Sequence, residues 1–263
     1  APKTYEAVAR LGVTTTTGDA EGDVLHECVV DRGLLTPQRL AQVCQAFTGA
    51  IRQVPPMYSA LKKDGKALYE YARAGVQVER AARDVQIHAL KLDLVLDEQA
   101  HPAIKLVVKC SKGTYIRTLG EDIGAALGCG AHLTFLRRID TGGLGIERCV
   151  TVAQLEAMDE AERLSCLLAP EALLAEHLNI TLDAEGAARF LSGVRRRGTW
   201  PDTQAVAVYG PVFGAEPAAL LGVGHTVAGE LIPDRLLSPL EIQQILQSTP
   251  SLSSTEAGIL ETP

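Results

Sequence analysis

Features that would place a protein in a membrane or outside the cell are missing from these 263 residues. No apolar run approaches the ~20 residues that cross a bilayer, and residues 1–25 lack the basic-then-apolar pattern of a signal peptide. The six cysteines form no C-x-x-C pair, which argues against a zinc knuckle or a redox dithiol. We therefore expect a cytoplasmic protein with reduced thiols and no membrane partner.

The motifs of several common enzyme classes are also missing. The sequence contains no G-x-S-x-G nucleophile elbow, no G-x-G-x-x-G nucleotide-binding turn, no P-loop and no H-E-x-x-H zinc motif. The six histidines include no pair spaced by four residues. These absences argue against serine hydrolases, dinucleotide enzymes and metal-dependent hydrolases.

The net charge of −7 conceals an uneven distribution of charge along the chain. Residues 151–190 carry eight acidic side chains against two arginines, whereas residues 51–75 and 101–120 are basic. Three consecutive arginines at 195–197 form a third basic group. Because nucleic-acid binding depends on where charges lie, this acidic protein remains compatible with a nucleic-acid partner.

Hydrophobic periodicity predicts an α+β protein. Strands are expected at residues 4–17, 84–96, 103–110 and 131–139. Helices are expected at residues 37–48, 66–73 and 116–127. Beyond residue 177, short strands separated by Gly and Pro predict a small β-rich domain at 178–237, followed by a flexible tail at 238–263.

One strand has an unusual face. Alternation places Leu133, Phe135 and Arg137 on the same side of the strand at 131–139. A buried arginine is costly unless a carboxylate pairs with it. Either this end of the strand is exposed, or an acid elsewhere in the fold pairs with Arg137.

The segment at 50–76 interrupts the regular pattern. Two adjacent prolines predict an extended loop at 54–65. The loop combines lysines with Tyr58, and Tyr69 and Tyr71 follow on the short helix. Basic groups that hold phosphate and rings that stack on bases suit looped RNA. The alternative is a solvated surface hairpin with half-buried tyrosines, which composition alone favours.

Five ordered segments carry a specific pattern. They are Lys3-Thr4-Tyr5 to Leu11-Gly12, Thr15-x-Thr17-x-Asp19-x-x-Gly22, Pro55 to Lys62 with Gly65, Tyr69, Ala72-Arg73 and Gly75, Cys110 to Leu119 with Asp122 and Gly124, and Gly130 to Leu133 with Leu136 to Arg138. At these spacings the chain resembles the TruB family of bacterial tRNA pseudouridine-55 synthases over residues 3 to about 156. The β-rich stretch is similar, less closely, to the family's PUA-like RNA-binding domain.

The resemblance implies a pseudouridine synthase fold, with a mixed, mostly antiparallel sheet and flanking helices in a catalytic domain at 1–177. Residues 52–80 would form an RNA-binding thumb, and residues 178–237 the PUA-like domain. The implied reaction converts uridine 55 in the T-loop of tRNA to pseudouridine, with the base flipped into a pocket and with neither metal nor cofactor. The expected partner is the tRNA T-arm, and we expect a monomer.

The resemblance also assigns site residues. In the family an aspartate starts the reaction, a tyrosine stacks on the flipped base and takes part in proton transfer, and an arginine pairs with the aspartate. Tyr5 matches the tyrosine and Arg137 the arginine. Phe135, Leu155 and Tyr115 are expected to bind the substrate alongside Tyr5, and Phe135 stands where the family often has tyrosine, without its hydroxyl group.

The thumb carries the expected RNA contacts. Lys62, Lys66 and Arg73 are assigned to phosphate groups, and Tyr58 to the RNA as well.

The family's aspartate lies in a Gly-x-Leu-Asp-Pro-x-Ala-[Ser/Thr]-Gly motif upstream of the strand that holds the tyrosine. No such motif occurs in residues 1–263. We therefore expect this chain to lack the family's N-terminal segment and to be inactive by itself. The alternative is a noncatalytic module that binds or folds tRNA, but Tyr5 and Arg137 favour the enzyme, because such a module has no use for an arginine aimed at an absent acid.

Overall fold

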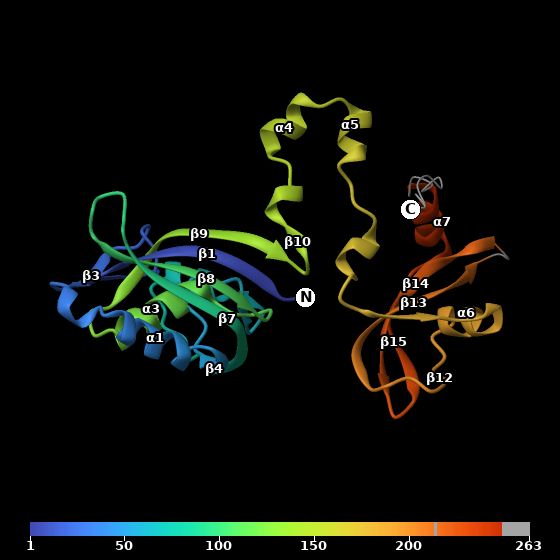
Figure 1. Ribbon diagram of the computed structural model, residues 1–263, viewed down its shortest axis with the longest axis horizontal. Coiled ribbons are helices and arrows are strands. Elements are labelled where there is room, and N and C mark those ends of the chain that lie inside the picture. The colour runs from blue at the N-terminus through green and yellow to red at the C-terminus, as the bar shows by residue number, and fades with distance from the viewer. Residues whose placement is uncertain (213–214, 249–263) are drawn as a thin grey trace, which may run out of the picture. The chain divides into compact units, whose positions relative to one another are not determined.

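The computed structural model describes residues 1–212 and 215–248, and it contains two compact units, Ala1–Cys149 and the part from Val150 onward. Each unit has its own hydrophobic core. Figure 1 labels the helices and strands of both units. The structural division after Cys149 precedes the expected domain boundary at residue 177. The assignment of catalytic and RNA-binding domains to those ranges stays a prediction.

An antiparallel sheet of six strands forms the centre of the first unit, in the order β10-β9-β1-β8-β7-β4. Its strands are β1 (Lys3–Leu11), β4 (Gly49–Gln53), β7 (Arg83–Leu96), β8 (Pro102–Cys110), β9 (Ala131–Thr141) and β10 (Leu144–Gly145). The strands expected at 84–96 and 103–110 are present as β7 and β8, and they pair with each other in antiparallel orientation.

Two helices pack on one face of this sheet, α1 (Pro37–Ala46) and α3 (Ile116–Ala126). The Thr36 hydroxyl accepts a hydrogen bond from the Arg39 backbone nitrogen at 3.2 Å and caps α1, which begins where a helix is expected. Buried side chains from alternate strand positions meet these helices, and they include Ala7, Ala9 and Leu106. The opposite face of the sheet, called here the open face, carries Glu6, Val8 and Lys105 at the intervening positions.

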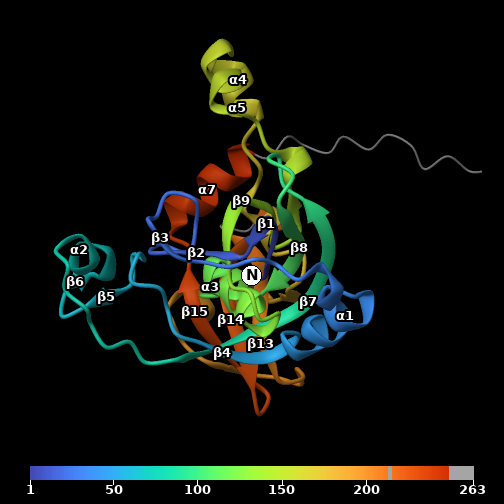
Figure 2. The same ribbon diagram turned by 90° about the vertical axis from the view of Figure 1, so that its left-hand side faces the viewer.

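A separate lobe, residues 54–80, connects β4 to β7 and is called the thumb below. Figure 2 shows its short strands β5 (Lys62–Lys63) and β6 (Lys66–Ala67) and helix α2 (Leu68–Arg73) to one side of the sheet. The expected extended loop thus contains a hairpin. Its two turn residues, Asp64 and Gly65, both have positive φ, at 51° and 78°, which matches the strand twist of a tight hairpin.

The first unit also contains a small hairpin of β2 (Val13–Thr15) and β3 (Val24–Glu27), with short 3-10 turns at Arg32–Leu34 and Ile146–Arg148. The turn at residues 16–23 connects these two strands. It lies beside β9, because the Gly18 carbonyl oxygen accepts a hydrogen bond from the Leu133 backbone nitrogen at 3.0 Å.

The second unit is built on a five-stranded sheet in the order β11-β13-β14-β15-β12, in which only the pair β11 and β13 is parallel among the described strands. Its elements are α4 (Val152–Ala157), α5 (Glu160–Ser165), a 3-10 turn (Pro170–Leu173), β11 (Leu178–Thr181), α6 (Ala184–Leu191), β12 (Arg196–Arg197), β13 (Thr203–Val212), β14 (Ala215–Val227), β15 (Glu230–Leu236) and α7 (Pro239–Ser248). The β-rich character expected after residue 177 is confirmed.

Helix α7 occupies the first part of the segment for which composition predicts a flexible tail. Ser238 and Glu241 form a reciprocal cap, with each backbone nitrogen donating to the other residue's side-chain oxygen at 2.7 and 3.2 Å. Ile242 is 1% exposed in the core of the second unit, so tertiary burial holds a helix that composition does not suggest. Residues 249–263 of the expected tail lie outside the described residues.

The structure therefore has the expected fold class, an α+β architecture with mostly antiparallel sheets, flanking helices and a β-rich C-terminal unit. No helix in the described ranges has the length and apolarity needed to cross a membrane.

Candidate functional site

The pairing of β1 with β9 decides which expected site residues share a face of the sheet. Tyr5 lies opposite Arg138, and the next residue, Glu6, lies opposite Arg137. Directly opposed residues of antiparallel strands point to the same side. Tyr5 therefore lies on the helix-covered face, half-buried against the core, whereas Arg137 lies on the open face.

Strand β9 contains a bulge that the alternation of its sequence does not predict. Val8 lies opposite Phe135 and Ala9 opposite Leu133, so Thr134 is an extra residue in the strand. The extra residue reverses the alternation, leaving Leu133 buried at 2% exposure and turning Phe135 to the open face at 44% exposure. The prediction that Leu133, Phe135 and Arg137 share one face is therefore wrong.

Arg137 is exposed on this open face. Within residues 1–212 and 215–248, no carboxylate forms an ion pair with its guanidinium group. This end of the strand is therefore exposed in the structure, and the pairing of Arg137 with an acid stays a prediction. The catalytic role of Arg137 stays a prediction.

Phe135 is one of the residues that line a pocket of about 780 Å³ on the open face. Val8, Arg10 and Lys105 line the sheet side of this pocket, and the Lys105 ammonium group forms an ion pair with Glu6. The ion pair raises the pKa of Lys105. The apolar ring of Phe135 beside the cations Arg10 and Lys105 can hold a flat, polar ring such as a nucleobase.

Leu155 belongs to α4 of the second unit, where its side chain is half-buried. Its carbonyl oxygen accepts a hydrogen bond from Arg163 Nε at 2.7 Å. The pocket role expected for Leu155 stays a prediction.

The three cations expected to contact RNA are exposed on the thumb, whereas Tyr58 is half-buried. Lys62, Lys66 and Arg73 all lie at the surface. The Lys66 ammonium group is 5.1 Å from the centre of the Tyr71 ring, and the Arg73 guanidinium group is 5.2 Å from the centre of the Tyr69 ring. These cation–π contacts restrain long side chains without neutralising them, which keeps their charge available to phosphate.

The thumb joins the sheet at a buried glutamine. Gln53 ends β4, is 2% exposed, and brackets the backbone of Tyr115, the residue before α3. The Tyr115 backbone nitrogen donates to Gln53 Oε1 at 3.0 Å, and Gln53 Nε2 donates to the Tyr115 carbonyl oxygen at 3.2 Å. Tyr115, which is expected to bind the substrate, thus holds the base of the thumb through its backbone.

We expect Gln53→Leu to lower the free energy of unfolding of the first unit by about 1–3 kcal/mol, because two partly buried backbone groups of Tyr115 lose their partners. Urea denaturation followed by circular dichroism measures the change. Gln45→Leu, an exposed position of α1, is the matched control. An equal loss of unfolding free energy in both variants would show that the hydrogen bonds between Gln53 and Tyr115 do not stabilise the first unit.

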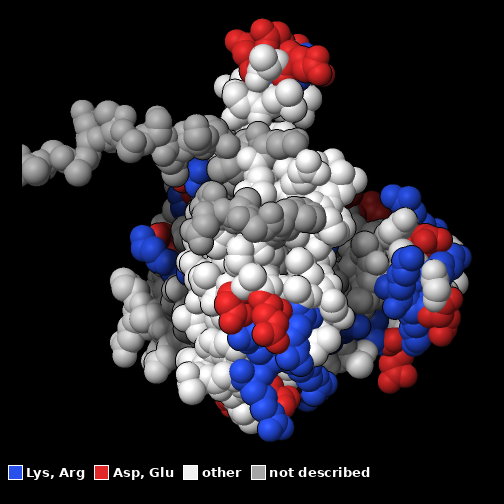
Figure 3. Space-filling model, turned by 90° about the vertical axis from the view of Figure 1, so that its right-hand side faces the viewer, with Lys and Arg blue, Asp and Glu red and all other residues white. Residues whose placement is uncertain are grey.

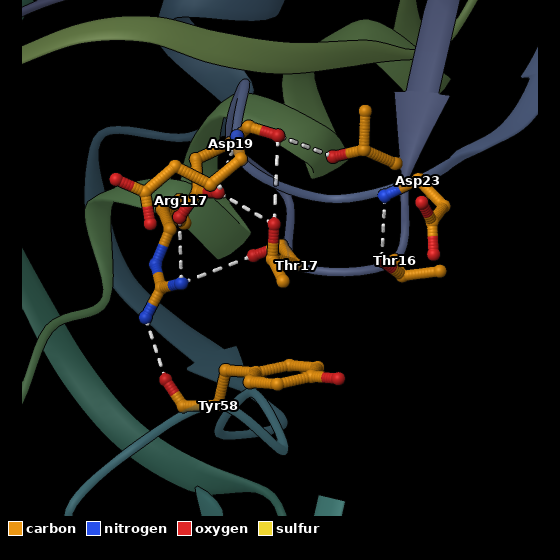
Figure 4. A network of polar contacts seen from close by, with 8 residues as sticks. Thr16, Thr17, Asp19, Asp23, Tyr58 and Arg117 are labelled. Carbon is orange, nitrogen blue, oxygen red and sulfur yellow. Dashed lines mark hydrogen bonds and ion pairs between the residues drawn. The ribbon is translucent and has the colours of Figure 1, made fainter. Parts of the chain in front are cut away.

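Arg117 is the centre of a polar network next to this bracket (Figure 4). Its Nη1 atom donates to Asp19 Oδ2 at 2.8 Å and to the Thr17 carbonyl oxygen at 3.1 Å. Its Nη2 atom donates to the Tyr58 carbonyl oxygen at 2.6 Å. The Thr17 hydroxyl donates to the other oxygen of Asp19, so both oxygens of this carboxylate are engaged.

Helix α3 carries two neighbouring carboxyl groups, Glu121 and Asp122, and Glu121 interacts with Arg117 and Asp19 of this network. Burial raises the pKa of Glu121, and the charges of Asp122 and Asp19 raise it further, whereas the Arg117 guanidinium lowers it. Burial likewise raises the pKa of Asp122. Gly18, at φ 72°, lies against Glu121, since a Cβ at Gly18 would be 2.8 Å from the Glu121 carboxyl carbon. The turn that holds Asp19 is therefore closely fitted to α3.

Gln53 and Arg117 both form hydrogen bonds at the base of the thumb, and the sequence does not single out either of them. Arg117 and Asp19 both occur in segments that carry the family resemblance, which is the signal that could have found them. Gln53 stands just before that pattern's proline pair, and no local signal marks it.

The second unit shows charges of both signs on the face in Figure 3. The basic group at 195–197 is largely paired, with Arg196 at 3.3 Å from Asp183, and with Arg197 at 3.1 Å and Arg195 at 3.9 Å from Glu230. Acidic side chains crowd the segment that holds α4 and α5, as expected for residues 151–190 (Figure 3).

Solved structures share this fold. A chain of a Cbf5-Nop10-Gar1 complex matches with a TM-score of 0.57 and 20% sequence identity, over 92% of this chain and 68% of that chain. A chain of an H/ACA RNP bound to a substrate RNA containing 2'-deoxyuridine matches with a TM-score of 0.54 and 18% identity, over 91% of this chain and 67% of that chain. At such low identity these matches show the fold alone.

Sequence comparison is more specific. Residues 1–116 match the model of the TruB family pseudouridylate synthase N-terminal domain, and residues 117–175 match that of the tRNA pseudouridylate synthase B C-terminal domain. A tRNA pseudouridine synthase B from Verminephrobacter eiseniae is 64% identical over 261 residues, which cover 99% of this chain and 77% of that protein. One from Ralstonia nicotianae is 51% identical over 239 residues, covering 90% of this chain and 75% of that protein. The chain belongs to the TruB family of pseudouridylate synthases.

Proposed function

We propose that this chain belongs to a tRNA pseudouridine synthase that isomerises uridine 55 in the T-loop. The observation that carries the proposal is the 64% identity, along nearly the whole chain, to a relative named tRNA pseudouridine synthase B. The thumb is basic, and two of its cations lie over tyrosine rings, which supports RNA as the partner.

The reaction requires the uridine to leave the base stack and enter a pocket, because its glycosidic bond is inaccessible inside a folded loop. Phe135 and the open-face pocket offer an apolar wall for a flipped base. Tyr5 is proposed to stack on the base and take part in proton transfer, and Arg137 to pair with the carboxylate that starts the reaction. In the structure these two residues lie on opposite faces of β1 and β9, so the roles rest on the family resemblance.

The carboxylate that starts the reaction is proposed to be supplied from outside residues 1–263, since the Gly-x-Leu-Asp-Pro motif does not occur among them. The 263 residues alone are then expected to bind T-arm RNA without forming product.

The test supplies the motif. The 263 residues are joined to an N-terminal segment that carries Gly-x-Leu-Asp-Pro, incubated with T-arm RNA, and the pseudouridine is located by chemical modification. Controls are the 263 residues alone, a segment with asparagine in place of the motif's aspartate, and an RNA with cytidine at position 55. We expect product only with the intact segment and only at position 55. No product from any combination would overturn the proposal, and a normal rate from the 263 residues alone would refute the external carboxylate.

The second candidate is a noncatalytic module that binds or folds tRNA, favoured by the missing motif. It predicts T-arm binding with no product even when the segment is supplied, so the same experiment separates the two.

Thumb cations are expected to account for much of the salt dependence of RNA binding. The triple substitution Lys62→Ala, Lys66→Ala and Arg73→Ala should lower the slope of log K against log salt concentration by about three, roughly one for each lost phosphate contact. Fluorescence anisotropy with labelled T-arm RNA at several salt concentrations measures it. Arg39→Ala, which removes an exposed cation from α1, should leave the slope unchanged. An unchanged slope in the triple variant would show that the thumb cations do not contact phosphate.

A further inference from the structure

Arg117 joins three segments that are far apart in the sequence. It lies in the first turn of α3 and donates hydrogen bonds to the turn at 16–23 and to the thumb. Its side chain is 24% exposed, and that of its partner Asp19 is 27% exposed. The pair is therefore partly shielded from water, where a charge-assisted hydrogen bond contributes more than at an open surface.

The contact with the thumb is a single short bond to a backbone oxygen, the Tyr58 carbonyl at 2.6 Å. Tyr58 is followed by the two strand-like bonds that close the thumb, from the Tyr69 nitrogen to the Ser59 oxygen at 3.1 Å and from the Leu68 nitrogen to the Leu61 oxygen at 2.8 Å. Fixing the Tyr58 carbonyl therefore fixes the point from which the thumb's hairpin and helix extend.

A rigid fork of donors is needed for this geometry. The planar guanidinium group of Arg117 bonds to the thumb through one nitrogen and to the turn through the other (Figure 4). A lysine ammonium group is a compact point charge and does not span the same acceptors. Asp19 in turn holds the guanidinium in place, since its second oxygen is bound by the Thr17 hydroxyl.

The same network continues into β9. The Gly18 carbonyl oxygen accepts from the Leu133 nitrogen at 3.0 Å, and Leu133 directly precedes the bulge that turns Phe135 to the open face. The base of the thumb and the strand that carries Phe135 and Arg137 are thus fixed to one turn.

We propose that Arg117 is a positioning residue that sets the thumb against the sheet for RNA binding, acting through the Tyr58 carbonyl and not by touching RNA. This inference rests on the proposed function, because it assigns the thumb to the T-arm. It predicts that loss of Arg117 disorders residues 54–76 and weakens RNA binding by weakening every thumb contact together.

The first test needs no RNA. Hydrogen exchange is compared in the wild-type chain, Arg117→Gln, Arg117→Lys and the control Arg39→Gln, which removes an exposed arginine that donates to the Ala126 carbonyl oxygen at 2.8 Å. We expect about tenfold faster exchange at residues 54–76 in Arg117→Gln, with the amides of β8 unchanged, and partial recovery in Arg117→Lys. Unchanged exchange in the thumb, or equal acceleration throughout the first unit, would overturn the proposal.

The second test is a double-mutant cycle on the affinity for T-arm RNA. We expect Arg117→Gln to weaken binding about tenfold, and Lys62→Ala to weaken it by a smaller factor in the Arg117→Gln background than in the wild type. If Lys62→Ala weakens RNA binding by the same factor in both backgrounds, Arg117 does not act through the thumb. If the wild-type chain binds no T-arm RNA, the proposed function fails, while the exchange experiment still decides whether Arg117 positions the thumb.

Discussion

Replacing Arg137 by alanine is expected to lower turnover by about a thousandfold, in the chain joined to a motif-bearing N-terminal segment. The affinity for T-arm RNA should change by less than about threefold, because the proposed partner of Arg137 is the catalytic carboxylate and not phosphate. Single-turnover rates at saturating enzyme give the first quantity, and fluorescence anisotropy gives the second. Equal losses in both would mean that Arg137 is an RNA contact.

Arg138→Ala is the variant to compare with Arg137→Ala, because the structure separates the two arginines. Both arginines are exposed on β9, but Arg138 lies opposite Tyr5 and shares its face, whereas Arg137 lies on the other face. The resemblance favours Arg137, and the strand register favours Arg138 as the neighbour of Tyr5. A larger loss of turnover in Arg138→Ala would show that the register, and not the family motif, identifies the catalytic arginine.

Replacing Phe190 by alanine is expected to lower the free energy of unfolding of the second unit by about 3–5 kcal/mol. Phe190 lies on α6, is 0% exposed, and is among the largest fully buried side chains in the described residues. Its removal leaves a cavity between α6 and the five-stranded sheet, because close-packed neighbours relax only in part.

A single tryptophan makes this loss measurable in the second unit alone. Trp200, the only tryptophan of the sequence, packs against the core that contains Phe190. Its fluorescence during urea denaturation reports on that unit, and Val194→Ala, at a position 41% exposed, is the control. We expect a change below about 0.5 kcal/mol for the control. A similarly small change for Phe190→Ala would contradict the assigned core.

Much of the fold follows from local signals in the sequence. Thr36 and Pro37 mark the start of α1, and the spacing of Ile116, Leu119 and Ile123 marks the buried face of α3, because capping and helical periodicity depend only on neighbouring residues. The exposed cations of the thumb are likewise evident from composition. The family itself follows from ordered motifs, whose specificity needs no structure.

Other features depend on contacts between distant segments. The bulge at Thr134 is set by the pairing of β9 with β1, and strand alternation within β9 gives no sign of it. Likewise α7 persists because Ile242 is buried in a core that the tail's composition does not reveal.

The sequence by itself determined the family, the element types and the charged thumb of this protein, all of which depend on residues close together in the chain. Only the tertiary structure decided which face each residue of β9 presents, and that Gln53 and Arg117 fix the base of the thumb. The physical reason is that a strand's register and a buried polar group's partner are both chosen by segments distant in sequence, through backbone hydrogen bonds that leave no local pattern.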